Sequence, residues 1–545
     1  MSGLLLLTFG LLGQWLLGVA VAHLVLSFAW WRSGLARSAR SVQPTERLDY
    51  GSPVAPPTGG SGSTEETPWA ELAGLGLVLG IGLTAWGLFV WSFCGGMLGR
   101  GASLTFTVLG FVCGGPITCK RLRSEWSRHS RAVQRRCPNQ PSFIEIDERR
   151  DAAWSRLCQW LIGGLTVIAI AQALLTPHHF WDERSIFAIK GLVLAADGTI
   201  RSPDLLDPDF VQYHPKYPLL IPVAEQHVYA LLGGVDDRLS KIVFPLLYLG
   251  LVLTMAGVMS RHFRPGAAWL FALLLATVPV LMPYELGFLS GQADAPVACF
   301  HGIALLYVWD ASRNGAAARR VIGASIIAGL CGALAAFTKD EGIAFLLVDV
   351  VALSLVFVVG VVLKRRCTGA RVPDPCFSDI AQRTGSSFRL LVAVVICAAI
   401  ILGPWFVHRR SLPLTTEMNY FGRASFSLVI ERLPVLVWEA VHLAHRMLWE
   451  WHHWGLHWWL MLVGLVFAPR RVLSASQLIL LLDVVGSLLA LMIAGMLAPA
   501  QLDEHIGGSS PRFLMQLVPV AVLFAAGQLA PRRETSVSLN PDELV

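Results

Sequence analysis

Long apolar runs recur from one end of the sequence to the other. A helix of about 20 apolar residues can cross the roughly 30 Å hydrocarbon core of a bilayer. The runs are continuous and do not alternate with polar residues, which argues against a β-barrel. Charged residues make up only 15% of the chain, whereas soluble domains carry about 25%. The sequence therefore predicts an all-α polytopic membrane protein with about 13 transmembrane helices, near 3–31, 75–98, 102–119, 157–176, 240–260, 267–284, 292–310, 321–338, 342–363, 388–407, 454–468, 473–497 and 513–530.

The basic residues predict how these spans are oriented. Lys and Arg are enriched in cytoplasmic loops, and an outside N-terminus followed by thirteen spans places every large basic cluster in the cytoplasm. Arg409, Arg410 and Arg512 fall on the outer side and need another explanation. Because the other basic residues follow this topology, the net charge of +6 does not indicate nucleic-acid binding. The cytoplasmic clusters are 120–136, Arg261/Arg264, Arg313/Arg319/Arg320, Lys364/Arg365/Arg366, Arg470/Arg471 and Arg532/Arg533.

The organisation of the chain follows from the same pattern. No predicted outer loop contains a cysteine, so no disulfide framework is expected. The first span lacks the basic start of a signal peptide, which favours a retained helix. We expect a multi-pass protein of the cytoplasmic membrane. The predicted units are an N-terminal transmembrane helix (1–31), a flexible cytoplasmic linker (32–74), an accessory helical hairpin (75–119), a basic cytoplasmic loop (120–156), a core (157–530) and a cytoplasmic tail (531–545).

The longest predicted outer segment, 177–239, opens with the acid pair Asp182-Glu183. The run 183–195 has helical spacing and would lie along the membrane surface. "HPKYPLLIP" contains Lys216 and Tyr217 and is broken by prolines, so it is expected to be extended or turned. A further short helix is expected to end at Gly233-Gly234.

Other polar groups fall on the same predicted face. "AFTKDEGIAF" places Lys339, Asp340 and Glu341 between two spans, and "QLDEHIGGSSPRFLMQLVP" places His505 and Arg512 before the last span. Glu285 and Asp294 lie near a membrane edge, and an amphipathic interfacial helix is predicted within 411–453. Cations at such a face could hold a phosphate, and a carboxylate could take a proton from an acceptor hydroxyl or amine.

In this order, "WDE", "HPKYPLLIP", "AFTKDEG", "GPWFVHRR" and "RFLMQLVP" resemble the GT-C glycosyltransferases. The branch they are most similar to holds protein O-mannosyltransferases and lipid A aminoarabinose transferases. The resemblance covers roughly residues 155–530 and leaves out the first three spans. It implies a polyprenyl- or dolichyl-phosphate sugar donor and a lipid, glycan or protein acceptor on the extracytoplasmic face.

The resemblance also implies roles for individual residues. Asp182 would be the general base or an acceptor-orienting carboxylate, with Glu183 as its partner. Where many relatives have glycine, this chain has two acids after Lys339, which departs from the pattern of a phosphate-binding lysine. A single displacement that inverts the sugar is expected, because no second nucleophilic carboxylate is evident. Lys216, Lys339 and Arg512 would hold the phosphate. The other substrate-binding candidates are Tyr217, Asp340, Glu341 and His505.

Simpler interpretations stand beside these roles. Asp182-Glu183 could cap the helix that follows them. Lys216 could snorkel, Lys339 could form a structural ion pair with Asp340 or Glu341, and Arg512 could anchor its span at the headgroups.

Metal binding and two other functions also remain open. Histidines gather on the outer face without a compact ligand pattern, so no metal ligand is predicted, and a divalent cation at that face is kept as an alternative. A transporter or lipid flippase would place ionisable residues in mid-span, and Asp483 is the one exception to their position at span ends. The other rival is a non-catalytic scaffold derived from a glycosyltransferase.

Overall fold

The computed structural model describes most of the chain, and within that part regular secondary structure is helical, apart from an isolated bridge between Phe263 and Arg532. The all-α polytopic architecture is confirmed. The described residues are 2–40, 67–134, 143–282, 287–313, 318–367, 380, 383–413, 425–498 and 502–533.

The helices follow the predicted runs along the whole chain. In the first half they are α1 (Ser2–Arg40), α2 (Trp69–Phe93), α3 (Arg100–Gln134), α4 (Phe143–Leu175), η1 (Glu183–Ala188), α5 (Ile189–Asp197), α6 (Pro203–Leu206), η2 (Pro208–Tyr213), α7 (Leu220–Leu232), α8 (Asp237–Ser240), α9 (Val243–Met259) and α10 (Pro265–Ala276). In the second half they are η3 (Pro279–Leu281), α11 (Asp294–Ala311), α12 (Ala318–Thr338), α13 (Asp340–Cys367), α15 (Thr384–Arg409), α16 (Phe426–Trp449), α17 (Trp451–Trp454), α18 (His457–Phe467), α19 (Pro469–Val472), α20 (Ala475–Leu497) and α21 (Leu502–Leu529).

Among the described residues, ten helices are long and apolar enough to cross a membrane. The other three predicted spans coincide with α10, α11 and α18; α10 and α18 are shorter apolar helices. The predicted outer helices are present as η1 with α5, as α7 and as α16. Both α5 and α7 end at a left-handed glycine, Gly198 and Gly233. The number of crossings and their orientation stay predictions.

Several helix boundaries differ from the predicted ones. Helix α1 continues to Arg40, so the first residues assigned to the linker are helical, whereas linker residues 41–66 lie outside the described part. Helices α3 and α4 extend well into the predicted basic loop. Hydropathy locates where an apolar run ends, but polar residues with good helix propensity continue the helix beyond that point.

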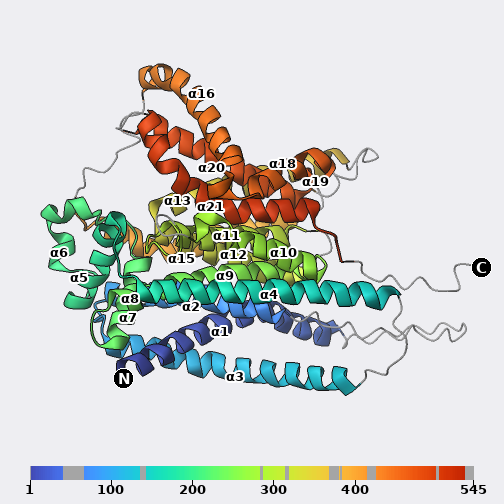
Figure 1. Ribbon diagram of the computed structural model, residues 1–545, viewed down its shortest axis with the longest axis horizontal. Coiled ribbons are helices and arrows are strands. Elements are labelled where there is room, and N and C mark those ends of the chain that lie inside the picture. The colour runs from blue at the N-terminus through green and yellow to red at the C-terminus, as the bar shows by residue number, and fades with distance from the viewer. Residues whose placement is uncertain are drawn as a thin grey trace, which may run out of the picture.

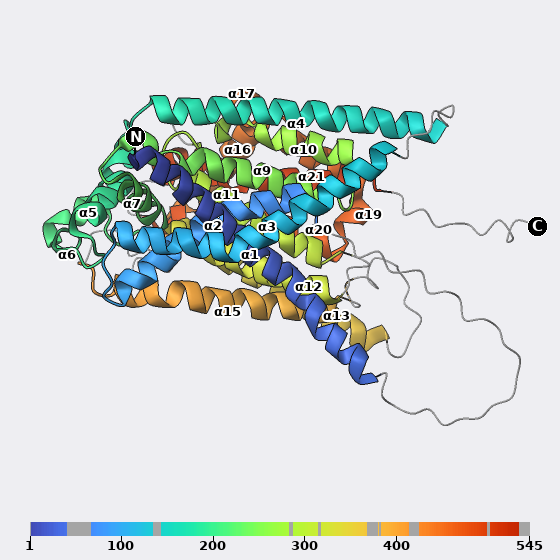
Figure 2. The ribbon, with the colours of Figure 1, turned by 90° about the horizontal axis from the view of Figure 1, so that it is seen from below.

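The long helices lie side by side along the long axis of the molecule (Figure 1). Helices α5–α8 and the start of α1 lie at one end, called here the α5–α8 end, and α19 lies toward the other, called the far end. In the second view, α1 crosses α2 and α3 obliquely (Figure 2). A side chain at Gly80 or Gly110 would clash with the α1 backbone, so glycine lets these helices approach closely. Helix α2 in turn packs against α9 and joins this unit to the core.

Helix α11 is the centre of the bundle, because each of its residues is buried. It packs against α9, α12 and α21. Its ionisable side chains Asp294, His301 and Asp310 are separated by about 10 Å and about 14 Å along the axis, at 1.5 Å per residue. A helix enclosed by protein tolerates such residues better than a lipid-facing one. Each of the three belongs to a separate polar cluster, one at each end of α11 and one in the middle.

Candidate functional site

Asp182 lies at the start of η1, at the α5–α8 end of the bundle. It occupies the N-cap position, but its carboxylate makes no capping hydrogen bond. Instead it forms an ion pair with Arg512 of α21, with side chains 19% and 36% exposed, respectively. Helix capping therefore does not explain Asp182, and Arg512, one of the cations that broke the charge rule, has a partner. This carboxylate and guanidinium are both within reach of a ligand.

Lys339 lies near this pair in space, at the junction of α12 and α13. Its Nζ is 2.8 Å from Asp294 Oδ1 and 2.8 Å from Glu341 Oε1. The Gln516 amide, one turn beyond Arg512 in α21, donates to the same Asp294 oxygen at 2.8 Å. Burial lowers the pKa of Lys339, but the two carboxylates outweigh burial and hold that pKa above its usual value. Lys339 thus forms the structural ion pair expected as its alternative role, in part with Asp294 rather than Asp340.

Asp340 explains a second exception to the charge rule. Both of its carboxylate oxygens accept hydrogen bonds from the Arg409 guanidinium, at 3.0 and 2.9 Å. The two side chains are about one-third and one-quarter exposed, respectively. Arg410 is exposed at the end of the same helix. Arg409 therefore balances one of the two acids that follow Lys339.

Sequence reasoning missed Lys190, a fully buried lysine of α5. Its Nζ donates to the His214 carbonyl at 2.5 Å and lies 5.6 Å from the centre of the Tyr217 ring. Burial lowers the pKa of Lys190 to about 7, opposed by the nearby Asp340 carboxylate. The residue sits in an amphipathic run, where a lysine usually indicates a solvated face. The signal that could have identified it is its position among Ile186, Ile189 and Leu194.

Tyr217 lies in the same region as Lys190. The His214 ring stacks on Tyr217 with centroids 5.0 Å apart. Burial, with Glu341 next in effect, raises the pKa of Tyr217. Lys216 is half-buried and forms no ion pair with the described residues. The side chain of His505 and all of Glu285 lie outside the described part of the chain.

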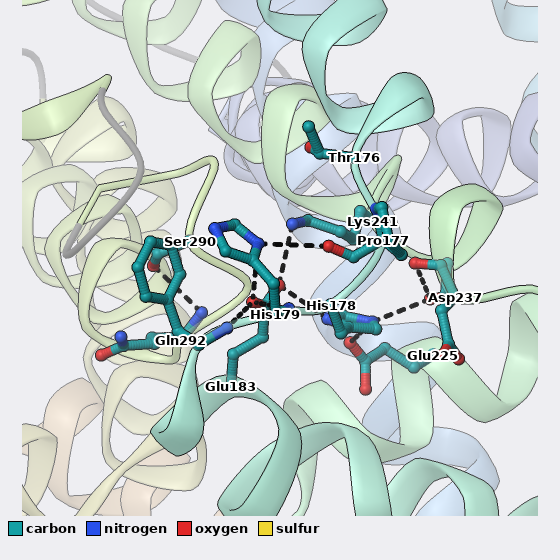
Figure 3. A network of polar contacts seen from close by, with 12 residues as sticks. Thr176, Pro177, His178, His179, Glu183, Glu225, Asp237, Lys241, Ser290 and Gln292 are labelled. Atoms are coloured by element: carbon teal, nitrogen blue, oxygen red, sulfur yellow. Dashed lines mark hydrogen bonds and ion pairs between the residues drawn. The ribbon is translucent and has the colours of Figure 1, made fainter.

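Glu183 has other partners than Asp182, and Figure 3 shows it among His178, His179 and Lys241. Its fully buried carboxylate accepts from the backbone amides of His179 and Phe180 at 2.9 and 3.0 Å. It also lies 2.7 Å from His178 Nδ1 and 2.8 Å from Lys241 Nζ. Burial raises the pKa of Glu183, but the contacts with His178 and Lys241 hold it below its usual value.

The loop that covers Glu183 depends on a glycine. Gly291 has φ +70°, and a side chain there would clash with the Glu183 carboxylate. The two backbone amides, His178 and Lys241 occupy the acceptor positions of the Glu183 carboxylate. This leaves Asp182, and not its neighbour, as the carboxylate that can exchange partners with a ligand.

A polar cavity of about 320 Å³ lies between α16 and the start of α21. Glu439 and His442 of α16, Glu450 directly after it, and Asp503 and Ser510 of α21 contribute to its lining. Arg446 holds the two helices together by donating to the Gly507 carbonyl at 3.0 Å and to Ser510 Oγ at 2.9 Å. Ser510 precedes Arg512 by two residues, so α21 connects this cavity to the Asp182 pair.

One group of side chains in the described part of the chain could hold a metal ion. His301, Asp349 and Asp483 lie within ligand-forming distance of one another, deeper in the bundle. A divalent cation at the Asp182 end is untested and stays a prediction.

Comparisons with known proteins return little. No family model and no curated protein matches the chain. Among solved structures, it is similar to the archaeal oligosaccharyltransferase AglB from Archaeoglobus fulgidus, determined in complex with an inhibitory peptide and a dolichol-phosphate. The sequence identity is 15% and the TM-score 0.35 over 68% of this chain, and the match spans 50% of that protein. A functional assignment therefore depends on the residues of the site.

Proposed function

We propose that the chain is an integral membrane glycosyltransferase that moves a sugar from a polyprenyl-phosphate carrier to a lipid, glycan or protein acceptor. The observation that supports this most is the accessible Asp182–Arg512 ion pair. It joins a base and a phosphate-binding group from segments far apart in the sequence. The predicted topology puts this pair on the extracytoplasmic face, where lipid-linked sugars would be presented.

The proposed reaction is a single displacement. Asp182 takes the proton of the acceptor hydroxyl or amine as that atom attacks the anomeric carbon. The bond between this carbon and the phosphate oxygen breaks, and the electron pair stays on the lipid phosphate. The Arg512 guanidinium stabilises the developing charge, since it has five donors and Asp182 occupies only part of them. Attack opposite to the leaving group inverts the anomeric configuration.

The surrounding groups hold this pair in position. Lys339 and Gln516 both bind Asp294, which ties the α12–α13 junction to α21 close to Arg512. Glu183 is a positioning residue in this scheme, because its buried hydrogen bonds set the path of the backbone just before Asp182. Lys190, whose pKa is lowered to about 7, adds a basic group beside Tyr217. The cavity beside α16 supplies a polar pocket for a head group or an acceptor.

The direct test is transfer from a panel of radiolabelled polyprenyl-phosphate sugars by the purified protein in proteoliposomes. We expect transfer from at least one donor, inhibition by unlabelled polyprenyl phosphate, and an inverted linkage by NMR of the product. Retained configuration would contradict the single displacement. Absence of transfer from every donor in the presence of lipid, glycan and peptide acceptors would contradict the function itself.

One observation favours the transporter alternative, because Asp483 is not the one acid away from the span ends: Asp349 lies nine residues into α13. His301, Asp349 and Asp483 are buried within helices and lie close together, and ionisable residues in mid-span often belong to proton or ion pathways. Proton or solute uptake in the same proteoliposomes, without added donor, would support that alternative.

A further inference from the structure

We infer that His301, Asp349 and Asp483 form a binding site for a divalent transition metal, for which Zn²⁺ is the best fit. The three residues come from separate helices, α11, α13 and α20, which pack together in the middle of the bundle. One ligand atom from each lies within 4.8 Å of the others. The site is about 10 Å along α11 from Asp294 and so is separate from the candidate transfer site.

The distances match the size of a zinc coordination shell. His301 Nε2 lies 3.3 Å from Asp483 Oδ1 and 3.7 Å from Asp349 Oδ1. Zinc binds imidazole nitrogen and carboxylate oxygen at about 2.0–2.1 Å in tetrahedral geometry, which separates neighbouring ligand atoms by about 3.4 Å. One imidazole and two carboxylates are also ligands that Zn²⁺ accepts. A single ion can therefore contact all three side chains with small adjustments.

Within the described residues, most polar atoms of the cluster lack a hydrogen-bond partner. Both Asp483 oxygens, both His301 ring nitrogens and Asp349 Oδ1 are buried without a well-aligned hydrogen bond in the described part of the chain. Asp483 is 0% exposed, His301 is 1% exposed and Asp349 is 4% exposed. Buried polar groups without partners are costly, and buried charges are usually paired or bind metal. The orphaned atoms point to a ligand that sits between them.

Charge leads to the same inference. Two buried carboxylates need two positive charges, and a divalent cation supplies them without protonating either acid. The ion pairs of these two acids within the described residues involve only His301. The Phe345 ring stacks on His301 at 4.5 Å, and Phe513 packs on Phe345 at 4.8 Å. These rings exclude water from one side of the site. The bound ion would link α11, α13 and α20 beneath the Asp294–Lys339 pair.

Elemental analysis of the protein purified without chelators tests the inference. We expect about one equivalent of Zn²⁺ per chain, lost in His301→Gln and in Asp483→Asn. His227→Gln is the matched control, because His227 of α7 is also buried, has no hydrogen-bond partner for either ring nitrogen among the described residues, and lies outside the cluster. This control should keep the metal. Metal retained by both cluster variants would overturn the inference.

A second measurement uses only the wild-type protein, in case the variants fail to fold. Metal is removed by chelation, and Co²⁺ is added to the protein in detergent. We expect saturable uptake of one equivalent with the strong visible absorption of tetrahedral cobalt, displaced by Zn²⁺. Absence of such uptake, with no metal in the isolated protein, would overturn the inference and leave proton sharing between the acids. Neither measurement uses donor or acceptor, so its failure is distinct from failure of the proposed transfer.

Discussion

The two ends of α11 carry charge clusters that differ in how far water and ligands can reach them. At the far end, Arg261 Nη1 lies 2.7 Å from Glu71 and Nη2 lies 2.9 Å from Asp310, with all three side chains at most 6% exposed. Tyr307 donates to Glu71 at 2.6 Å and closes the network. At the α5–α8 end, the Lys339–Asp294 pair is also buried, but Asp182 and Arg512 beside it remain accessible.

The difference separates a structural network from a candidate site. At the far end the acids have protein partners, so the cluster can hold α2, α9 and α11 together but has no capacity for a substrate. At the other end, an accessible pair can exchange a protein partner for a ligand at small cost, because exposed ion pairs contribute little to stability. Charge alone thus does not identify a site; charge with access does.

The largest expected effect tests the far end. Asp310→Asn leaves Arg261 buried with one partner fewer, which should lower the free energy of unfolding by about 3–5 kcal/mol. Asp147→Asn is the matched control, because its pair with Arg264 is exposed, and it should change stability by less than about 1 kcal/mol. Thermal unfolding in detergent measures both. Equal shifts in the two variants would remove the distinction between buried and exposed networks.

The next effect tests the adjacent acids. Glu183→Gln leaves Lys241 buried without its carboxylate and should lower the free energy of unfolding by about 3 kcal/mol, while the donor KM of the folded fraction stays near that of the wild type. Thermal unfolding and donor titration at a permissive temperature give the two values. A variant of normal stability that had lost transfer would instead make Glu183 a reacting group.

A smaller effect concerns donor binding. Arg512→Gln should raise the donor KM about 10- to 100-fold, since a hydrogen bond to a charged group contributes about 1.5–3 kcal/mol. Stability should hardly change because the pair is partly exposed. Arg410→Gln, at an exposed arginine of the same end, should leave KM as it is. An unchanged KM for Arg512→Gln would confine Arg512 to anchoring its helix.

A further effect is a pH dependence from Lys190. Its pKa of about 7 is lower than the usual value of about 10.4 in the unfolded chain, so the unfolded state binds more protons between these two values. Stability contributed at this position should therefore increase as pH rises from about 7 to about 10. The measurement is the unfolding temperature of the wild type and of Lys190→Met at about pH 6 and about pH 9. Relative to the variant, the wild type should unfold at a higher temperature at about pH 9 than at about pH 6. A constant difference would contradict the buried position of Lys190.

The sequence was sufficient for the helices and for part of the site. Apolar runs locate the helices because their length is a local property, and acids and cations at span ends pointed to Asp182, Lys339 and Arg512. Which of two adjacent acids faces the site could not be read, since successive helical residues point about 100° apart and the direction depends on packing. The pairing of Arg409 with Asp340 depends on how α13 and α15 approach each other.

Other parts of the site depend on the surroundings of a residue. Asp294 and His301 are ordinary polar breaks in an apolar run until α11 is known to be enclosed by protein on all sides. Lys190 has a helical position typical of a surface lysine, and only the tertiary structure shows it to be buried. Long-range packing thus decides which polar residues of the chain are structural and which are accessible.

The most direct test of the central claim is the initial rate of sugar transfer by Asp182→Asn beside the wild type in the same proteoliposomes. Asp204→Asn, at an exposed acid of α6, serves as the control. We predict a rate lower by about 10²- to 10⁴-fold for Asp182→Asn, as for loss of a general base, with the unfolding temperature unchanged and the control fully active. Equal rates for Asp182→Asn and the wild type would contradict the role of this accessible carboxylate.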